Sequence, residues 1–397
     1  MPERNLDFDT VVNRKNTRSL KYDSARAAGY PEDILPLWVA DMDFKTSSYV
    51  EDALAELARY NLYGYSNTQP GDGFFESVRG WMKRQHNWDV EESWHLKTPG
   101  VCFAIATAVR AFTEPGDAVI IQQPVYYPFS GLVKQNGRKV ISSDLVQNED
   151  GSYRADFEDF ERKIAENRVK MFILCNPHNP VGRVWTEEEL IRLGKICAEH
   201  RVIVFSDEIH GDFIWSGTHR VFQEADPSFR GFTVTATAPS KTFNLAGLQQ
   251  SNIFIPDPEL RRRFTAEFQK TGFDEPNIFG ITAAQAVYEH GDEWYEAMKK
   301  YVAENIAFAD DFVREKLPGF RMRKPEGTYL IWLDGRGTGL SPAALDEAIV
   351  RKARLWLDSG SMFGKAGAGF QRINTACPRS ILREALERLE SVFSDPR

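Results

Sequence analysis

The sequence predicts an α/β fold in which a mainly parallel sheet, sandwiched by helices, forms a large domain, and a smaller α+β domain accompanies it. The first observation is that short, β-branched apolar runs alternate with amphipathic stretches through the middle of the chain. The second is that these runs are apolar along their whole length, as in strands covered on both faces. The third is that 397 residues suit roughly two domains of about 150 to 200 residues each.

Six apolar runs are predicted as buried strands because each is short, β-branched and bounded by Pro, Asp or Gly. These strands are 117–124, 138–145, 169–177, 201–208, 232–240 and 250–256. Amphipathic stretches near them predict helices at 100–113, 155–167 and 186–200. The last helix begins with a Thr cap and an acidic first turn.

The pattern changes after about residue 285. Further helices are predicted at 291–317, 341–356 and 379–393, and strands at 328–334 and 369–377. We therefore expect three parts: an N-terminal segment that joins the small domain, a large domain and a small C-terminal domain. Their bounds are 1–50, 51–285 and 286–397.

Composition argues against several classes of partner. The formal net charge is -8 and the Lys and Arg residues are scattered, so neither nucleic acid nor an anionic membrane is an expected partner. No apolar run approaches the ~18 to 20 residues of a membrane span, and the N-terminus lacks the apolar core of a signal peptide. Four cysteines without paired spacing and seven histidines without a metal-type cluster predict a reduced, cytoplasmic protein with no metal site.

Polar residues follow three of the predicted strands. Asn179 lies in "CNPHNPVGR", Asp207 in "SDEIH" and Lys241 in "APSKTF". Taken singly, an Asn-Pro pair is usually a turn, an Asp after a strand is often a helix cap, and a Lys near a strand end usually lies on the surface. Ligands of open α/β sheets bind beyond the carboxyl ends of the strands, so the three together predict one pocket.

Pyridoxal phosphate chemistry requires this set of side chains. A partly desolvated lysine such as Lys241 forms a Schiff base with the cofactor aldehyde. Asp207 is the candidate carboxylate that keeps the pyridine nitrogen protonated, so that the ring withdraws electrons. Asn179 can donate its amide to the 3-hydroxyl. Tyr126 and Tyr127, in "QPVYYPF", can supply an aromatic ring that stacks on the cofactor.

The cofactor phosphate calls for a helix N-terminus. The stretch "TPGVCFAIATAVRAF" offers one, because Gly100 permits close approach and the amides of Val101 and Cys102 begin the helix. The apolar helix around Cys102 favours a packing role for its thiol over a redox role.

The order of these motifs resembles the fold-type I pyridoxal phosphate enzymes of the aminotransferase class I/II superfamily. Within it, the chain most resembles the cystathionine β-lyase or cysteine-S-conjugate β-lyase branch (MalY/PatB type). The motifs that carry the resemblance are "LWVADMDF" (37–44), "YGYS" (63–66), "NPHNPVGRVW" (176–185), "SDEIHGDF" (206–213), "SKTFNLAGLQ" (240–249) and "PEGTYLIWLD" (325–334). The resemblance implies a seven-stranded type of sheet and a homodimer with the active site at the interface.

The resemblance also implies roles. Lys241 would hold the cofactor and shuttle the Cα proton, Asp207 would pair with the pyridinium nitrogen, and Asn179 would bond the 3-oxygen near the substrate. Tyr126 would stack on the ring, and Tyr127 could reach the phosphate or the leaving group.

Two further residues take roles from the resemblance. Tyr65 is similar to the tyrosine that crosses to the phosphate of the other subunit. Arg372 matches the arginine that clamps the substrate α-carboxylate, which a planar guanidinium can bind bidentately. Without the family context, an ion pair on a strand is the simpler interpretation of Arg372.

Two positions depart from the general aminotransferase pattern. His210 stands where many members have Tyr, and Gln249 stands where many have a phosphate-binding Arg. Phosphate binding would then depend on backbone amides, on the helix dipole and on the hydroxyls of Ser240 and Tyr65. Both departures recur in the β-lyase branch.

The resemblance thus implies α,β-elimination of L-cystathionine or related cysteine thioethers to a thiol, pyruvate and ammonia. A class I/II aminotransferase would share every cofactor contact, and a regulatory protein-binding role is a further alternative.

In "VADMDF" we expect Asp41 and Asp43 to shape the entrance of the pocket, with Met42 near the substrate. The glycine-rich stretch 359–370 is expected to deliver Arg372.

Overall fold

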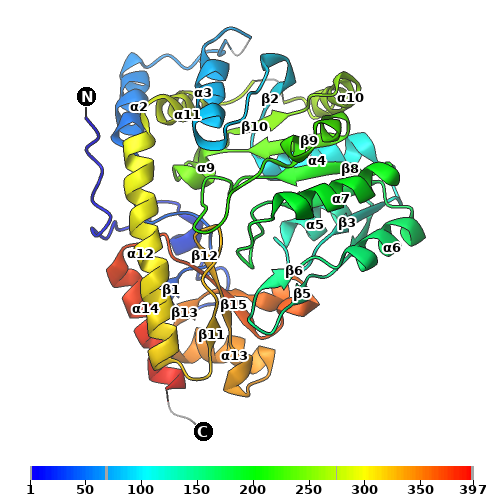
Figure 1. Ribbon diagram of the computed structural model, residues 1–397. Helices are drawn as coiled ribbons and strands as arrows, with labels where there is room; N and C mark the ends of the chain where they lie inside the picture. The colour runs from blue at the N-terminus through cyan, green and yellow to red at the C-terminus, as the bar shows by residue number, and fades with distance from the viewer. Residues whose placement is uncertain (1, 68–69, 274, 395–397) are drawn as a thin grey trace.

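The computed structural model describes residues 2–67, 70–273 and 275–394. Figure 1 shows a large sheet with helices on both sides and, beside it, a smaller group of strands and helices. The long helix α12 (Asp292–Lys316) runs along one side of both parts and lies against α14 (Arg379–Phe393) at its C-terminal end.

The large sheet has seven strands in the order β2-β10-β9-β8-β7-β3-β4. Their bounds are His95–Thr98, Ser251–Phe254, Thr233–Thr237, Ile203–Asp207, Met171–Cys175, Ala118–Ile121 and Lys139–Ser142 in that order. The five strands from β9 to β4 are parallel, and β10 is antiparallel to both of its neighbours. The predicted fold class is confirmed.

Alternation along the strands explains why helices cover both faces of this sheet. In β3, Ala118 and Ile120 pack toward α6 and α7, whereas Val119 and Ile121 pack toward α4, α5 and α10. These helices are Phe157–Asn167, Glu187–Glu199, Val101–Phe112, Pro128–Gln135 and Pro258–Gln269. Helix α7 begins at the predicted cap, where Thr186 and Glu189 form a capping box.

The smaller sheet is antiparallel, in the order β11-β12-β15-β14. Its strands are Arg321–Met322, Leu330–Asp334, Phe370–Asn374 and Asp358–Ser359. The N-terminal segment reaches this part through β1 (Leu35–Pro36), which pairs in parallel with β13 (Leu355–Trp356). A hairpin of β5 (Val146–Gln147) and β6 (Tyr153–Arg154) extends from the large part.

Two elements differ from the prediction. The helix expected over 341–356 ends early: α13 covers Pro342–Glu347, a π-helical turn covers Ala348–Lys352, and β13 follows. Arg354 has a φ of 54°, which breaks the helix before the chain pairs with β1. Strand β2, "HLKT", was not predicted because it carries polar residues and is only partly buried.

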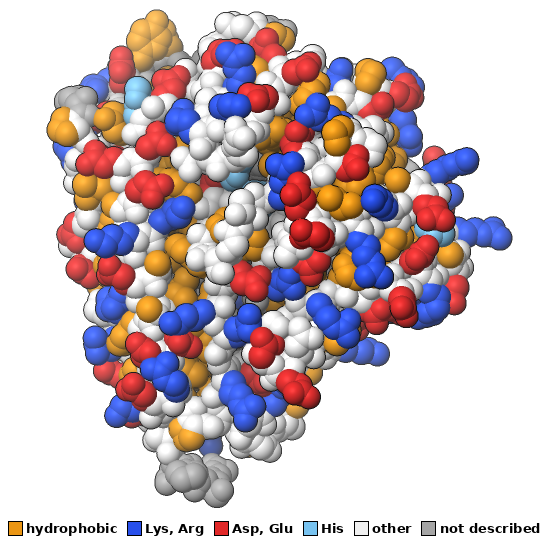
Figure 2. Space-filling view, viewed as in Figure 1, with side chains coloured by type: hydrophobic (Ala, Val, Ile, Leu, Met, Phe, Trp, Pro, Cys, Tyr) orange, Lys and Arg blue, Asp and Glu red, His pale blue; other side chains and the backbone are white. Residues whose placement is uncertain are grey.

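The remaining helices are α1 (Leu20–Asp23), α2 (Ser48–Tyr60), α3 (Phe74–His86), α8 (Phe222–Ala225), α9 (Pro239–Thr242) and α11 (Ile278–His290). Of these, α2, α3 and α11 pack together beside the large sheet (Figure 1). None of the helices in the described part of the chain combines the length and apolar character that a membrane crossing requires. On the face seen in Figure 2, side chains of both charge signs are interspersed.

Candidate active site

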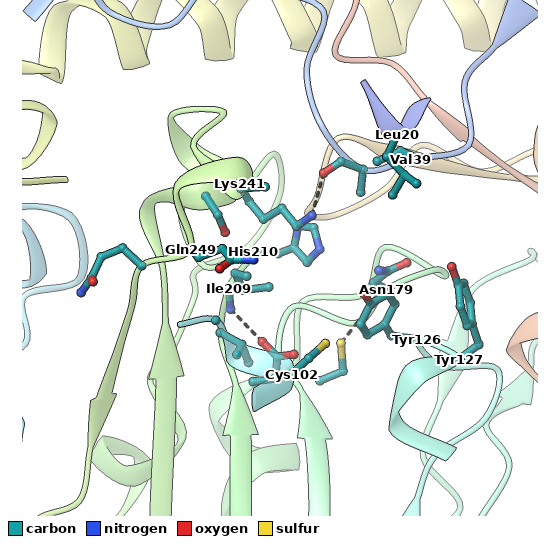
Figure 3. Close-up of a pocket in the computed structure, with 18 of the residues that line it drawn as sticks. Leu20, Val39, Cys102, Tyr126, Tyr127, Asn179, Ile209, His210, Lys241 and Gln249 are labelled. Carbon is teal, nitrogen blue, oxygen red and sulfur yellow. Dashed lines mark hydrogen bonds between the residues drawn. The ribbon is translucent and has the colours of Figure 1, made fainter. Parts of the chain in front are cut away.

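A cavity of about 290 Å³ opens at the carboxyl ends of the central strands β7, β8 and β9. The predicted site residues that line it come from both parts of the molecule and from distant stretches of the sequence. They are Gly100, Val101, Cys102, Tyr126, Tyr127, Asn179, Asp207, His210, Ser240, Lys241 and Arg372. Figure 3 shows Lys241 and His210 facing the cavity from one side and Asn179, Tyr126 and Tyr127 from the other.

Lys241 reaches this cavity because the short helix α9 follows β9 directly. Its Nζ donates a hydrogen bond of 2.6 Å to the carbonyl oxygen of Ala40. Burial lowers the pKa of Lys241 to about 8, and the positive charge of Arg372 acts in the same direction. The amine is therefore easier to deprotonate than an ordinary lysine, as a nucleophile or base requires.

Asp207 is the last residue of β8 and is buried. Its carboxylate accepts one hydrogen bond, of 3.2 Å, from the backbone N–H of Ile209. Burial raises the pKa of Asp207 to about 7, although the N–H of Ile209 and the charge of Lys241 oppose that shift. A cationic ring nitrogen beside this carboxylate would favour its ionised form.

Arg372 lies on β15 and is buried against the rim of the cavity. Its Nη1 donates to Asn179 Oδ1 at 3.1 Å, and its Nη2 donates to the carbonyl of Trp38 at 2.7 Å and to the carboxylate of Asp358. The guanidinium also lies over the ring of Phe363. The ion pair that the sequence suggested as the simpler interpretation is therefore present, and Arg372 nevertheless lines the cavity.

The N-terminus of α4 lines the cavity. Gly100, with a φ of 135°, precedes the helix, and no side chain caps the first turn. Val101 and Cys102 begin this 12-residue helix and line the cavity with their neighbour Gly100. Uncapped amides at the positive end of a helix dipole suit a phosphate. Ser240 lines the same cavity, as does Gln249.

His210 is buried, and its Nδ1 has no hydrogen-bond partner among the described residues. Burial holds the pKa of His210 well below its usual value, and the charges of Lys241 and Arg372 add to this effect. These effects favour the neutral imidazole. An unsatisfied, buried ring nitrogen beside a cavity is the kind of group that a polar ligand satisfies.

Two predicted residues lie elsewhere. Tyr65 is 99% exposed and does not line the cavity of its own chain. Met42, which we expected near the substrate, is fully buried in a hydrophobic cluster and does not line the cavity. The carboxylates on either side of it turn to the N-terminal segment: Asp41 and Asp43 both bind Arg14, and Asp43 binds Lys21.

Sequence reasoning missed the backbone of Trp38, Val39 and Ala40, which lines the cavity and supplies carbonyl oxygens to Arg372 and Lys241. The motif "LWVADMDF" marked this segment, but residue identity does not show which backbone carbonyls face a cavity. Asp358 was also missed, although it lies directly opposite Arg372 in the pairing of β14 with β15.

The residues present fit pyridoxal phosphate. The cavity offers a lysine of lowered pKa, a buried carboxylate, an unsatisfied imidazole nitrogen and an uncapped helix N-terminus. The lysine suits an aldehyde, and the carboxylate suits a ring nitrogen. The imidazole nitrogen suits a polar substituent, and the helix N-terminus suits a phosphate. Fold and cavity together define a class of protein, the α/β enzymes that use a lysine-bound aldehyde cofactor. Residues 32–389 match the family described as aminotransferase class I and II.

The chain belongs to that family, and the resemblance seen in the motifs is confirmed. It is 42% identical over 390 residues to cystathionine beta-lyase PatB of Bacillus subtilis, covering 98% of this chain and 100% of that one. It is 30% identical to protein MalY of Escherichia coli, covering 97% of this chain and 98% of that protein. The solved structure of cystalysin from Treponema denticola, which contains a pyridoxal 5'-phosphate cofactor, superposes with a TM-score of 0.94 at 38% identity, covering 98% of this chain and 99% of that one.

Proposed function

We propose that this protein is a pyridoxal phosphate-dependent carbon–sulfur β-lyase. It cleaves L-cystathionine or related cysteine thioethers with water to a thiol (homocysteine from cystathionine), pyruvate and ammonia. The observation that carries the proposal is the meeting of Lys241, with its lowered pKa, and the buried Asp207 at one cavity. Full-length similarity to a cystathionine beta-lyase favours the lyase over an aminotransferase.

The cofactor, when bound, supplies an electrophilic aldehyde and a ring that withdraws electrons from the substrate Cα. Lys241 Nζ takes the Cα proton and holds it, which its lowered pKa permits near neutral pH. With the cofactor bound, the buried carboxylate of Asp207 would hold the proton of the ring nitrogen.

The substrate is oriented by charge and by hydrogen bonding. Arg372 binds the α-carboxylate with the guanidinium that Asn179 and Asp358 hold in place. Tyr126 and Tyr127 line the cavity. Tyr126 would stack on the cofactor ring, and Tyr127 could reach the phosphate or the leaving group. The uncapped first turn of α4 and Ser240 would hold the phosphate.

The test uses purified full-length protein with pyridoxal phosphate and L-cystathionine, without any keto acid. Stoichiometric pyruvate and thiol support the lyase, and turnover only after addition of a keto acid would instead identify an aminotransferase. We expect Lys241→Ala to lose the absorption band of bound cofactor and nearly all turnover. Replacing the exposed Lys134 on α5 by Ala is the matched control and should change neither.

We further propose that the protein is a homodimer in which Tyr65 reaches the phosphate of the partner subunit. The segment around it exposes Tyr60, Leu62, Tyr63 and Tyr65, a run of apolar side chains that a monomer rarely leaves open. Mixing Lys241→Ala with Tyr65→Ala should restore about a quarter of wild-type activity, because half of the dimers are mixed and each has one intact site. Absence of any recovery in a mixture shown to exchange subunits would contradict a shared site.

The cytoplasm is the compartment that we propose. Cys102, Cys175, Cys197 and Cys377 are all free thiols, as expected of a protein in a reducing environment. Fractionation of cells that express the tagged protein tests this, and recovery from an oxidising compartment would contradict it.

A further inference from the structure

The segment 38–46, which we call the N-terminal strap, crosses the site with its backbone toward Lys241. The carbonyl of Ala40 accepts hydrogen bonds from Lys241 Nζ at 2.6 Å and from the hydroxyl of Tyr329 at 2.9 Å. Tyr329 is fully buried, so this carbonyl would keep one donor even when the amine is engaged elsewhere. The strap thus offers the free amine a fixed acceptor.

The N-terminal strap is held rigidly on its outer side. Lys21, which is fully buried, pairs with Asp43 at 2.6 Å. Arg14 pairs with Asp41 and Asp43, each at 2.7 Å. Two cations against two carboxylates, mostly shielded from water, fix the backbone at positions 41 to 43. These ion pairs therefore fix the position of the Ala40 carbonyl independently of any substrate.

The strap is also bonded directly to the turn that carries Lys241. Asn244 Oδ1 accepts from the N–H of Met42 at 2.9 Å, and Asn244 Nδ2 donates to the carbonyls of Met42 and Phe44 at 3.0 and 3.2 Å. The hydroxyl of Thr46 donates to the carbonyl of Phe243 at 2.7 Å. Asn244 has a φ of 58°, a conformation that Asn tolerates better than most residues do. One amide side chain thus sets the register between the strap and the lysine turn.

We propose that Asn244 is a positioning residue, which acts through the N-terminal strap to aim the free amine of Lys241 for proton transfer. The proposal rests on the proposed function, in which Lys241 must be released before it takes the Cα proton. It also gives the motifs "LWVADMDF" and "SKTFNLAGLQ" a shared role, because the Asn244 side chain of the second motif bonds to the backbone of Met42 in the first. A purely structural role for Asn244 is the competing explanation.

The test compares Asn244→Gly with the wild type, because glycine accepts the same positive φ while it removes the three hydrogen bonds. With L-cystathionine we expect kcat to fall about tenfold and KM to stay within about twofold, since Asn244 does not line the cavity. Thr46→Val should act in the same direction but more weakly. The matched control is Asn87→Gly, at an exposed position with a φ of 48° that lies outside the cavity, and it should change nothing.

A second readout needs no turnover. In the full-length protein freed of cofactor, the rate at which an amine-reactive ester labels Lys241 is followed against pH by peptide mass spectrometry. The hydrogen bond to Ala40 favours the ammonium, so its loss in Asn244→Gly should move the labelling midpoint down by about half to one pH unit.

An unchanged midpoint, whether or not the melting temperature falls, would overturn the proposal in favour of a structural role. A lowered midpoint together with a lowered kcat would support it. If the wild type released no pyruvate, the proposed function would fail, whereas the labelling result would still report on the position of the amine.

Discussion

Arg372 and Asn179 are joined by a hydrogen bond of 3.1 Å between Nη1 and Oδ1. The bond occupies the oxygen of the amide and leaves its nitrogen to donate toward the cavity, where the 3-oxygen of the cofactor is expected. The guanidinium Nε has no partner among the described residues. One amide therefore couples the group expected to bind the substrate carboxylate to the group expected to bind the cofactor.

Arg372→Lys tests the substrate end of this pair. The ammonium keeps a positive charge beside Asp358, so the fold should survive, but it cannot present two parallel N–H groups to a carboxylate. We expect kcat/KM for L-cystathionine to fall about 10- to 100-fold, mainly through KM. Steady-state kinetics measure this, with the exposed Arg314→Lys as control. A KM unchanged from wild type would show that Arg372 does not bind the substrate.

Asn179→Ala tests the proposed cofactor contact and the contact with Arg372 at once. The variant removes the donor proposed for the cofactor oxygen and the acceptor that orients Arg372. We expect cofactor affinity to weaken about tenfold and KM to rise, whereas Arg372→Lys should raise KM and leave cofactor affinity unchanged. Fluorescence titration of cofactor-free protein with pyridoxal phosphate gives the first quantity. Normal cofactor affinity in Asn179→Ala would assign the 3-oxygen to another donor.

The sequence was informative wherever a side chain at a strand end carries the chemistry. Asn179, Asp207 and Lys241 each follow an apolar run, and parallel topology brings such positions to one edge of a sheet. The carbonyl of Ala40 could not be predicted, because any residue supplies a carbonyl and its placement depends on contacts about 200 positions away. The early end of the helix expected at 341–356 also depends on a contact distant in sequence, because pairing with Leu35 overrides the local helical pattern.

His210 should remain neutral throughout the working range of the enzyme. Burial, and then the charges of Lys241 and Arg372, keep the pKa of His210 well below its usual value. The imidazole nitrogen signals of His210 should therefore not move between about pH 6 and 8, a range in which free histidine titrates. Nitrogen-15 NMR of histidine-labelled protein measures this, and His210→Gln assigns the signals. A titration near pH 6.5 would mean that the site admits water to this ring.

Asp207 should make the stability of the cofactor-free protein depend on pH. Burial raises its pKa from 3.8 in the unfolded chain to about 7 in the folded chain, so between these values the folded state binds the extra proton. The contribution of Asp207 to stability is therefore fully present below about pH 4 and is lost as the pH rises through about 7.

Asp207→Asn cannot titrate, so it isolates this contribution. The free energy of unfolding of the wild type, minus that of Asp207→Asn, should decrease as the pH rises from about 4.5 to 7.5. Urea denaturation of both cofactor-free proteins at the two pH values measures the difference, and the exposed Asp33→Asn serves as control. A difference that stays constant, or that grows with pH, would mean that the folded cavity does not raise the pKa of Asp207. The ring nitrogen would then meet a carboxylate that is already ionised before the cofactor binds.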